Sequence, residues 1–456
     1  MAAFIVSSFG QFVMSLFAGL FTARSWQTFT VLAYGWAVAS GERQTITTYL
    51  WLTGATTLKH FSRFYAFLGA TLYHARWQLW ARIIRCAAWW VPAEATIRIV
   101  VDDSTKKKAG RQIEGIGHYR NGAGSARQEY RTLRGLNFVW GVMRVPVPGW
   151  PGQSVSVPIG LSLYLKEEQA QRLQLPYQSR STLAREIVDF VAAQLPTRRI
   201  RVLGDGGYAT KEYLHHLPPT VDVVSRMLIT GKFYALPPKR TTPRRGCPPK
   251  KGLLVGSPKT LARKRFGWYP HPTEAGTLVQ AWTGLWHTVL PGRLIQVVVV
   301  RRPRPLRARK AGQRKPPPAV EAFFTTDLTL SLAAILAQYR ERWAVEITIR
   351  ESNALAGFGH DQCRKYERVV GANTLRLVLA AARTLWFVEQ TGQRTADRDL
   401  TRYRPWYRHK VAPSQLDIVW TWREALHAAG VFPIPRFASG LAEIPQEPEK
   451  ELPLAA

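Results

Sequence analysis

Five polar side chains recur at helical spacing within one short stretch of the sequence: Tyr339, Arg342, Glu346, Arg350 and Asn353. The preceding residues 330–337 are rich in strong helix formers, so we predict one helix over residues 331–354. At about 100° per residue, the five side chains share one narrow arc. Burying charge is costly unless it is paired or bound to a metal ion. Either a buried Arg–Glu network fixes helix packing, or Glu346 holds a metal ion and the arginines contact an anionic substrate.

The rest of this helix should divide into apolar flanks and a solvent-facing side. The flanks carry Trp343, Val345, Ile347 and Ile349. We expect water to contact the far side, which carries Arg340, Glu341, Thr348, Glu351 and Ser352.

Two acidic residues follow a β-branched run, residues 96–101, which predicts a strand that ends at Asp102 and Asp103. Adjacent residues of a strand point to opposite faces, so only one of these carboxylates can face a common site. Three lysines follow after Ser104 and Thr105: Lys106, Lys107 and Lys108. They suit contact with a phosphate backbone; a surface turn with solvated charge is the alternative.

Another strand-like run, residues 199–203, leads to Asp205, which lies among glycines. Glycines let the backbone approach a ligand closely. A strand that delivers a carboxylate at its C-terminal end is a common way to build a metal site in an α/β protein. If Asp205, Glu346 and one acid of the first strand converge at one sheet edge, they can hold two divalent ions for an in-line phosphoryl transfer. Carboxylate ligands suit Mg²⁺, and the placement of His and Cys argues against zinc.

The elements that must position these acids form an α/β pattern. Predicted strands are residues 136–145, 154–165, 221–225, 277–286, 294–300 and 321–326. Predicted helices are residues 181–191, 211–216, 373–389 and 415–429. Pro- and Gly-rich residues 146–152 join the first two of these strands as in a hairpin.

The charge of the chain indicates a polyanionic partner. Lys and Arg number 63 against 30 Asp and Glu, which gives a formal net charge of +33. Nucleic acid is the favoured partner, with an anionic membrane surface as its rival. Two Pro-rich basic stretches, residues 236–251 and 301–318, read as mobile arms for nucleic-acid contact. Three distant cysteines predict no disulfide framework and a reducing compartment.

The N-terminal part is predicted to be helical. Residues 1–22 contain no charged residue, and we favour a buried helix over a membrane span because polar residues dilute the apolar run. Aromatic residues and leucines recur at helical spacing up to about residue 94, with arginines interspersed. Such a region either docks on DNA or forms a helical cap on the core.

In this order, the motifs resemble those of a DDE transposase of a bacterial insertion sequence. That family carries Tyr, two residues, Arg, three residues, Glu, six residues and Lys. Tyr339, Arg342 and Glu346 match it, whereas Asn353 stands where lysine is expected and Arg350 is a substitute for that lysine. For the first acid the resemblance favours Asp102, with Asp103 still open.

The resemblance implies a mixed RNase H-like sheet with helices, interrupted by a β-rich insertion. It implies a helical domain (1–94), a catalytic core in two parts (95–227 and 320–395), a basic insertion (228–319) and a C-terminal helical region (396–456). Expected metal ligands are Asp102, Asp205 and Glu346, for two Mg²⁺ ions or Mn²⁺ in their place. Expected substrate contacts are Tyr339, Arg342, Arg350, Asn353, Lys106 and Lys107.

The implied activity is cut-and-paste DNA transposition. The partners would be double-stranded DNA, as terminal inverted repeats and target, and a second copy of the chain, in the cytoplasm at the nucleoid and without a membrane. Three alternatives remain: a non-catalytic DNA-binding protein such as a decayed transposase, a basic protein attached to an anionic membrane, and an RNase H-like nuclease that does not transpose.

Overall fold

The computed structural model describes residues 1–120, 131–238, 247–303, 319–393 and 405–432. Within them, twelve strands form one sheet. The strands are β1 (Ile97–Lys107), β2 (Gly117–Arg120), β3 (Thr132–Pro146), β4 (Ser154–Tyr164), β5 (Ile200–Gly204), β6 (Val221–Arg226), β7 (Phe233–Tyr234), β8 (Leu254–Gly256), β9 (Tyr269–Pro270), β10 (Leu278–Leu285), β11 (Leu294–Arg302) and β12 (Ala319–Thr325).

The centre of the sheet has the strand order β4–β3–β1–β5–β6. β3 runs antiparallel to β1 and to β4, whereas β1, β5 and β6 are parallel neighbours. The predicted hairpin is therefore confirmed as β3 and β4, and the mixed sheet is the expected RNase H-like one. β1 does not end at its two acids as predicted, because its pairing with β3 continues as far as Lys107 opposite Gly135.

The strands that follow β6 extend the same sheet. β12 pairs antiparallel with β6, and β11, β10, β7 and β8 follow outward in that order. Val297 to Val300 in β11 are fully buried on both faces, as in strands covered on two sides. The strands predicted in this region are confirmed, whereas most of the two basic arms, at 239–246 and 304–318, lies outside the described residues.

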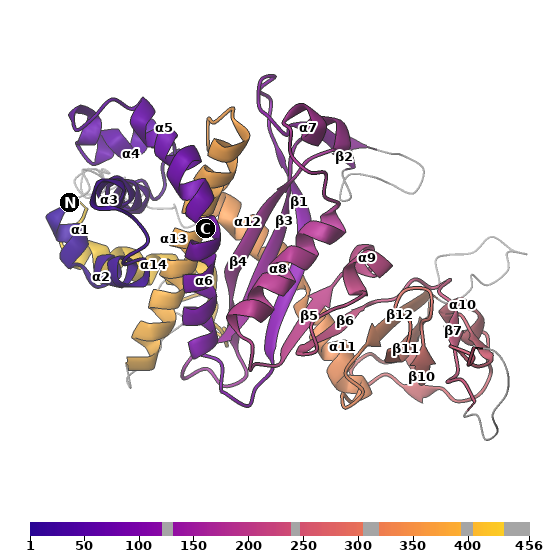
Figure 1. Cartoon of the computed structure of the whole chain (residues 1–456). Coiled ribbons are helices and arrows are strands. Elements are labelled where there is room, and N and C mark those ends of the chain that lie inside the picture. Colours follow the sequence, from indigo (N-terminus) through magenta and orange to yellow (C-terminus); the bar gives the residue numbers. More distant parts are fainter. Residues whose placement is uncertain (121–130, 239–246, 304–318, 394–404, 433–456) are drawn as a thin grey trace, which may run out of the picture.

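Helices cover both faces of the central sheet (Figure 1). They are α1 (Ala2–Val6), α2 (Ser8–Leu16), α3 (Ala23–Val38), α4 (Ile46–Leu52), α5 (Ser62–Phe67), α6 (Tyr73–Trp89), α7 (Glu167–Arg172), α8 (Arg180–Gln194), α9 (Lys211–Leu214), α10 (Pro258–Leu261), α11 (Leu332–Glu341), α12 (Trp343–Leu355), α13 (Tyr366–Gln393) and α14 (Gln415–Ala428). Short turns η1 (Ala55–Thr57), η2 (Leu68–Leu72) and η3 (Gly206–Tyr208) complete them. α8, whose N-terminus is capped by Ser179, packs on one face and α12 on the other.

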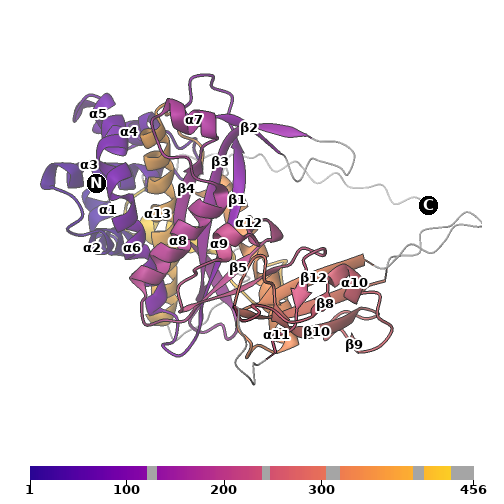
Figure 2. The same ribbon diagram turned by 45° about the vertical axis from the view of Figure 1, so that its right-hand side comes forward.

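The N-terminal region is helical, as expected, and packs beside the sheet against α13 (Figures 1 and 2). The charge-free start forms two short helices instead of one, because Ser7 is extended and its hydroxyl caps α2 by accepting the Gly10 N–H at 3.0 Å. Phe4 and Phe9 are fully buried. In the described part of the chain, no helix is both long and apolar enough to cross a bilayer.

Two polar contacts fasten this helical layer to the loop after α12 and to α13. Trp36 in α3 donates its indole N–H to the carbonyl of Ala356 at 3.1 Å. Arg376 in α13 is fully buried and donates to the carbonyl of Gln44 at 2.6 Å. Buried donors without partners are costly, so these contacts determine how the layer lies against α12.

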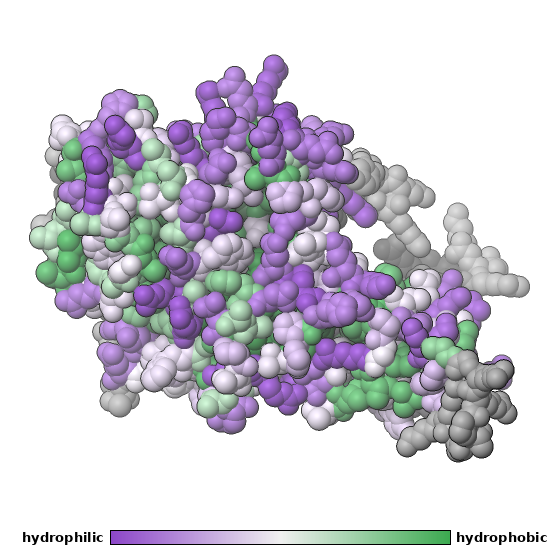
Figure 3. Space-filling view, viewed as in Figure 1, coloured by the Kyte–Doolittle hydropathy of each residue, from purple (hydrophilic) through white to green (hydrophobic). Residues whose placement is uncertain are grey.

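Hydrophilic and hydrophobic residues occupy different parts of the outer surface. Hydrophilic residues cover most of the face in Figure 3, and hydrophobic residues gather over the strands of the insertion. Within residues 228–319, Leu253 and Phe266 are each 85% exposed.

Candidate active site

The two acids of β1 point to opposite faces of the sheet, as predicted. Asp102 lies opposite Trp140 of β3, and its carboxylate accepts a hydrogen bond from Arg342 Nη1 at 3.1 Å. Asp103 instead accepts from Asn137 Nδ2 at 2.9 Å and from the Tyr208 hydroxyl at 3.2 Å. Of the two, Asp102 is thus the one on the face of α12.

Arg342 joins Asp102 to Glu346. Its guanidinium group donates to Asp102 through Nη1 and to Glu346 Oε1 through Nη2 at 2.8 Å. Burial alone would lower the pKa of Arg342, but the hydrogen bond to Glu346 and the charge of Asp102 raise it above its usual value. Two carboxylates on separate elements therefore converge on one cation.

Asp205 lies beside Asp102 at the end of β5. The parallel register pairs Val101 with Gly204. Asp102 and Asp205 directly follow these two residues, so they lie at the same level of adjacent strands. Asp205 accepts a hydrogen bond from the Tyr339 hydroxyl at 3.4 Å. Asp102, Asp205, Glu346, Tyr339 and Arg342 thus form one connected polar cluster, which we call the acid cluster.

Burial dominates the electrostatics of Asp102 in the acid cluster. The pKa of Asp102 is raised to about 7, first by burial and further by the negative charges of Asp103 and Asp205. The Asp103 backbone N–H and the charge of Arg342 oppose this rise. The cluster consequently favours additional positive charge.

The donor chemistry of the cluster suits a hard divalent ion, since all three acids offer carboxylate oxygens. Still, over the described ranges no three His, Cys, Asp or Glu side chains lie together as a ready metal site. The Arg342 guanidinium is the cation that Asp102 and Glu346 share.

The predicted single helix is two helices, α11 and α12, separated at Arg342. The predicted sides of α12 are also wrong. Thr348 and Ser352, expected in water, are buried, whereas Arg350, expected to face inward, is exposed. Small residues let α12 approach the sheet and α14 closely, so they form the buried side and the charged arc lies at its edge.

The remaining predicted contacts divide between the two faces of β1. Asn353 is half-buried, and its Oδ1 accepts from Lys106 Nζ at 2.5 Å. An ammonium group is therefore present where the resemblance expects a lysine, but it comes from β1. Lys107 is exposed, and the alternation of the strand turns it to the other face.

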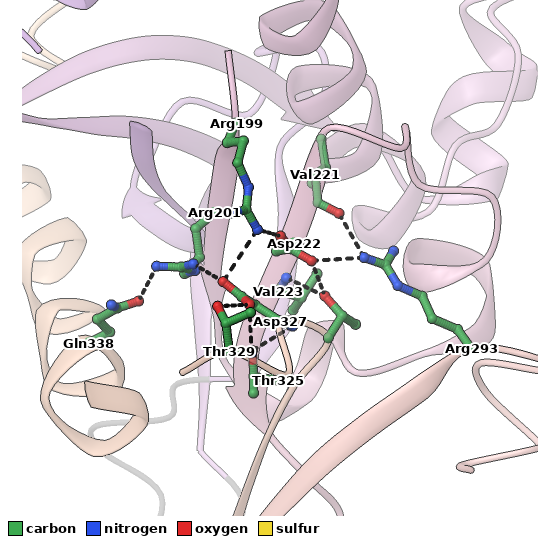
Figure 4. Close-up of polar contacts among 11 residues, drawn as sticks. Arg199, Arg201, Val221, Asp222, Val223, Arg293, Thr325, Asp327, Thr329 and Gln338 are labelled. Carbon is green, nitrogen blue, oxygen red and sulfur yellow. Dashed lines mark hydrogen bonds and ion pairs between the residues drawn. The ribbon is translucent and has the colours of Figure 1, made fainter. Parts of the chain in front are cut away.

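A buried charge network beneath α11 was not anticipated from the sequence (Figure 4). Arg201 in β5 donates to Asp327, which follows β12, and to Gln338 Oε1 in α11 at 3.1 Å. Arg293 and Arg199 both pair with Asp222 at the start of β6. Gln338 directly precedes Tyr339, so the network holds α11 where Tyr339 reaches Asp205. An arginine inside an otherwise apolar strand was the available signal.

Replacing Asp327 by alanine should destabilise the fold by about 3–5 kcal/mol, because Arg201 would remain buried without its partner. Arg199→Ala is the matched control: its side chain is 60% exposed, and we expect a loss below about 1 kcal/mol. Urea denaturation at pH 7 measures both. Hydrogen bonds from Thr329 and the charge of Arg201 outweigh burial and lower the pKa of Asp327, so this contribution should disappear as the pH falls below about 4.

Asp102→Asn should stabilise the metal-free protein at pH 8 by about 1–3 kcal/mol. The folded wild type holds a proton on Asp102 up to pH 7 or so, whereas the unfolded chain releases it near pH 4. The wild type therefore loses stability across that window as pH rises, and the variant does not. Denaturation in a chelator at several pH values measures this; equal curves at all pH values would contradict it.

A family model described as DDE superfamily endonuclease matches residues 16–288, more than half of the chain. The match covers Asp102, Asp103 and Asp205 and ends before Glu346. No curated protein matches the chain.

Proposed function

The chain belongs to the DDE superfamily of endonucleases, and from this premise we propose that it is the transposase of a bacterial insertion sequence, cutting and joining DNA with divalent metal ions. The observation that carries this proposal is the acid cluster. Asp102 in β1 and Asp205 directly after β5 lie at the same level of adjacent strands. Arg342 donates hydrogen bonds to both Asp102 and Glu346. Metal-dependent phosphoryl transfer needs carboxylates from separate elements on shared ions. Arg342 thus links two of the three acids, and Asp205 lies at the level of Asp102 on the adjacent strand.

Asp102, Asp205 and Glu346 would hold Mg²⁺, or Mn²⁺ in its place. When bound, such ions activate an attacking oxygen and neutralise charge on the leaving oxygen. In this proposal Arg342 turns from the carboxylates to the substrate phosphate, which its planar guanidinium suits. Tyr339 orients Asp205 through its hydroxyl and lies beside the same phosphate.

The predicted division of the chain enters the proposal unchanged. Residues 1–94 would contact DNA, residues 95–227 and 320–395 would form the catalytic core, the insertion at 228–319 would add basic contacts, and residues 396–456 would complete the helical region. The excess of positive charge, +33 overall, suits a DNA duplex with terminal inverted repeats and a homodimer that joins two ends at the nucleoid.

Asp205→Asn and Glu346→Gln should each reduce Mg²⁺-dependent cleavage of duplex DNA by at least about 100-fold, since even residues that only orient metal ligands typically cost 10–100-fold. Asp102→Asn should reduce cleavage by the same factor. Asp103→Asn, whose side chain is on the other face, should retain at least about a tenth of the cleavage activity. Undiminished cleavage in a variant removes that residue from the site. DNA binding without Mg²⁺-dependent cleavage by the wild type favours the non-catalytic alternative.

Millimolar Mg²⁺ or Mn²⁺ should raise the melting temperature of the wild type at pH 8. Ligand at 100 times its Kd stabilises a folded protein by about 2.7 kcal/mol. The Glu346→Gln and Asp205→Asn variants should lose most of this shift, and a chelator should reverse it. An equal shift in all three proteins would show that the ion binds elsewhere.

A further inference from the structure

β1 carries a second charged group on the face of the acid cluster. Asp102 lies opposite Trp140 and Lys106 opposite Leu136, so both side chains point to the α12 face. Four residues of a strand span about 13 Å. Lys106 therefore lies between β1 and α12 but well away from the acids.

Two neighbouring segments, α12 and the loop that follows it, hold the Lys106 side chain in place. Its Nζ donates to Asn353 Oδ1 at 2.5 Å, and the Asn353 amide in turn donates to the Ile349 carbonyl at 2.8 Å. The lysine stem passes over Gly359, where a Cβ would lie 2.5 Å from Lys106 Cε. A lysine side chain normally has several free rotatable bonds, so this one is unusually well positioned.

Lys106 has no ion-pair partner among the described residues, although the negative charge of Asp361 acts on it from a distance. The partner of its Nζ is the neutral amide of Asn353. Lys108, which directly follows β1, pairs with Asp361 at 3.3 Å and is 11% exposed at its side chain. A half-buried ammonium group held by a neutral acceptor is suited to an anion from outside.

We propose that Lys106 binds a non-scissile phosphate of the DNA strand that is cut, and that Asn353 is the positioning residue that holds its ammonium group. This rests on the proposed function and adds the path of the strand, which follows β1 away from the acids. With an axial rise of about 3.4 Å per nucleotide, the bound phosphate lies about three to four nucleotides from the one at the acid cluster.

The test is the salt dependence of binding to a DNA duplex of arbitrary sequence, measured by fluorescence anisotropy with the full-length protein. Each phosphate neutralised contributes about 0.9 to the slope of log K against log salt concentration. Lys106→Gln keeps a hydrogen-bond donor for Asn353 but carries no charge, so it should reduce the magnitude of the slope by about 0.9. Lys106→Met should do the same, and Lys106→Arg should keep most of it. Lys107→Met, on the other face, should change the slope by less than half as much.

Exchanging the charged residue between positions 106 and 353 tests whether Lys106 acts through its charge or only through its contact with Asn353. Asn353→Lys together with Lys106→Asn returns one ammonium group to the same place from the helix side and should restore the slope that Lys106→Asn alone loses. An unchanged slope in Lys106→Gln and Lys106→Met, with a wild type that binds and cuts DNA, overturns this inference and leaves the proposed function standing. A wild type without salt-dependent DNA binding overturns both.

Discussion

Carboxylates that meet in a half-buried place need a cation among them, and the arrangement of the catalytic face depends on this constraint. Asp102 and Asp205 stand side by side on parallel strands, and burial with mutual repulsion raises the pKa of Asp102 to about 7. Arg342 supplies positive charge there by forming ion pairs with both Asp102 and Glu346. Because it stands where α11 ends and α12 begins, the same ion pairs determine how α12 lies across β1.

The features that depend on short-range periodicity could be predicted from the sequence. The alternation of β1 predicts that Asp102 and Asp103 separate, and β-branched runs predict most of the central strands. The break at Arg342 and the buried side of α12 could not be predicted in this way. Helical spacing places Thr348 and Ser352 opposite the charged arc, but only tertiary packing against the sheet and α14 decides which side is buried.

Buried charges outside the acid cluster show the same limit. Arg201 and Asp327 are 126 residues apart in the sequence, and Arg376 and Gln44 are 332 apart. No local pattern pairs them, although an arginine in an apolar strand or helix indicates that a partner must exist. Through these contacts the helical layer and α11 belong to the scaffold of the site as much as the sheet does.

The unbroken sheet has a mechanical consequence. Its hydrogen-bonded ladder runs from β8 through β7, β10, β11 and β12 to β6 and β5, whose last residue precedes Asp205. Three residue pairs join β12 to β6, whereas seven join β11 to β12, so the insertion and the core share a narrow but continuous pairing. The insertion and the strand that ends before Asp205 therefore belong to one sheet, so a displacement of β12 would reach the backbone beneath the acids through β6 and β5.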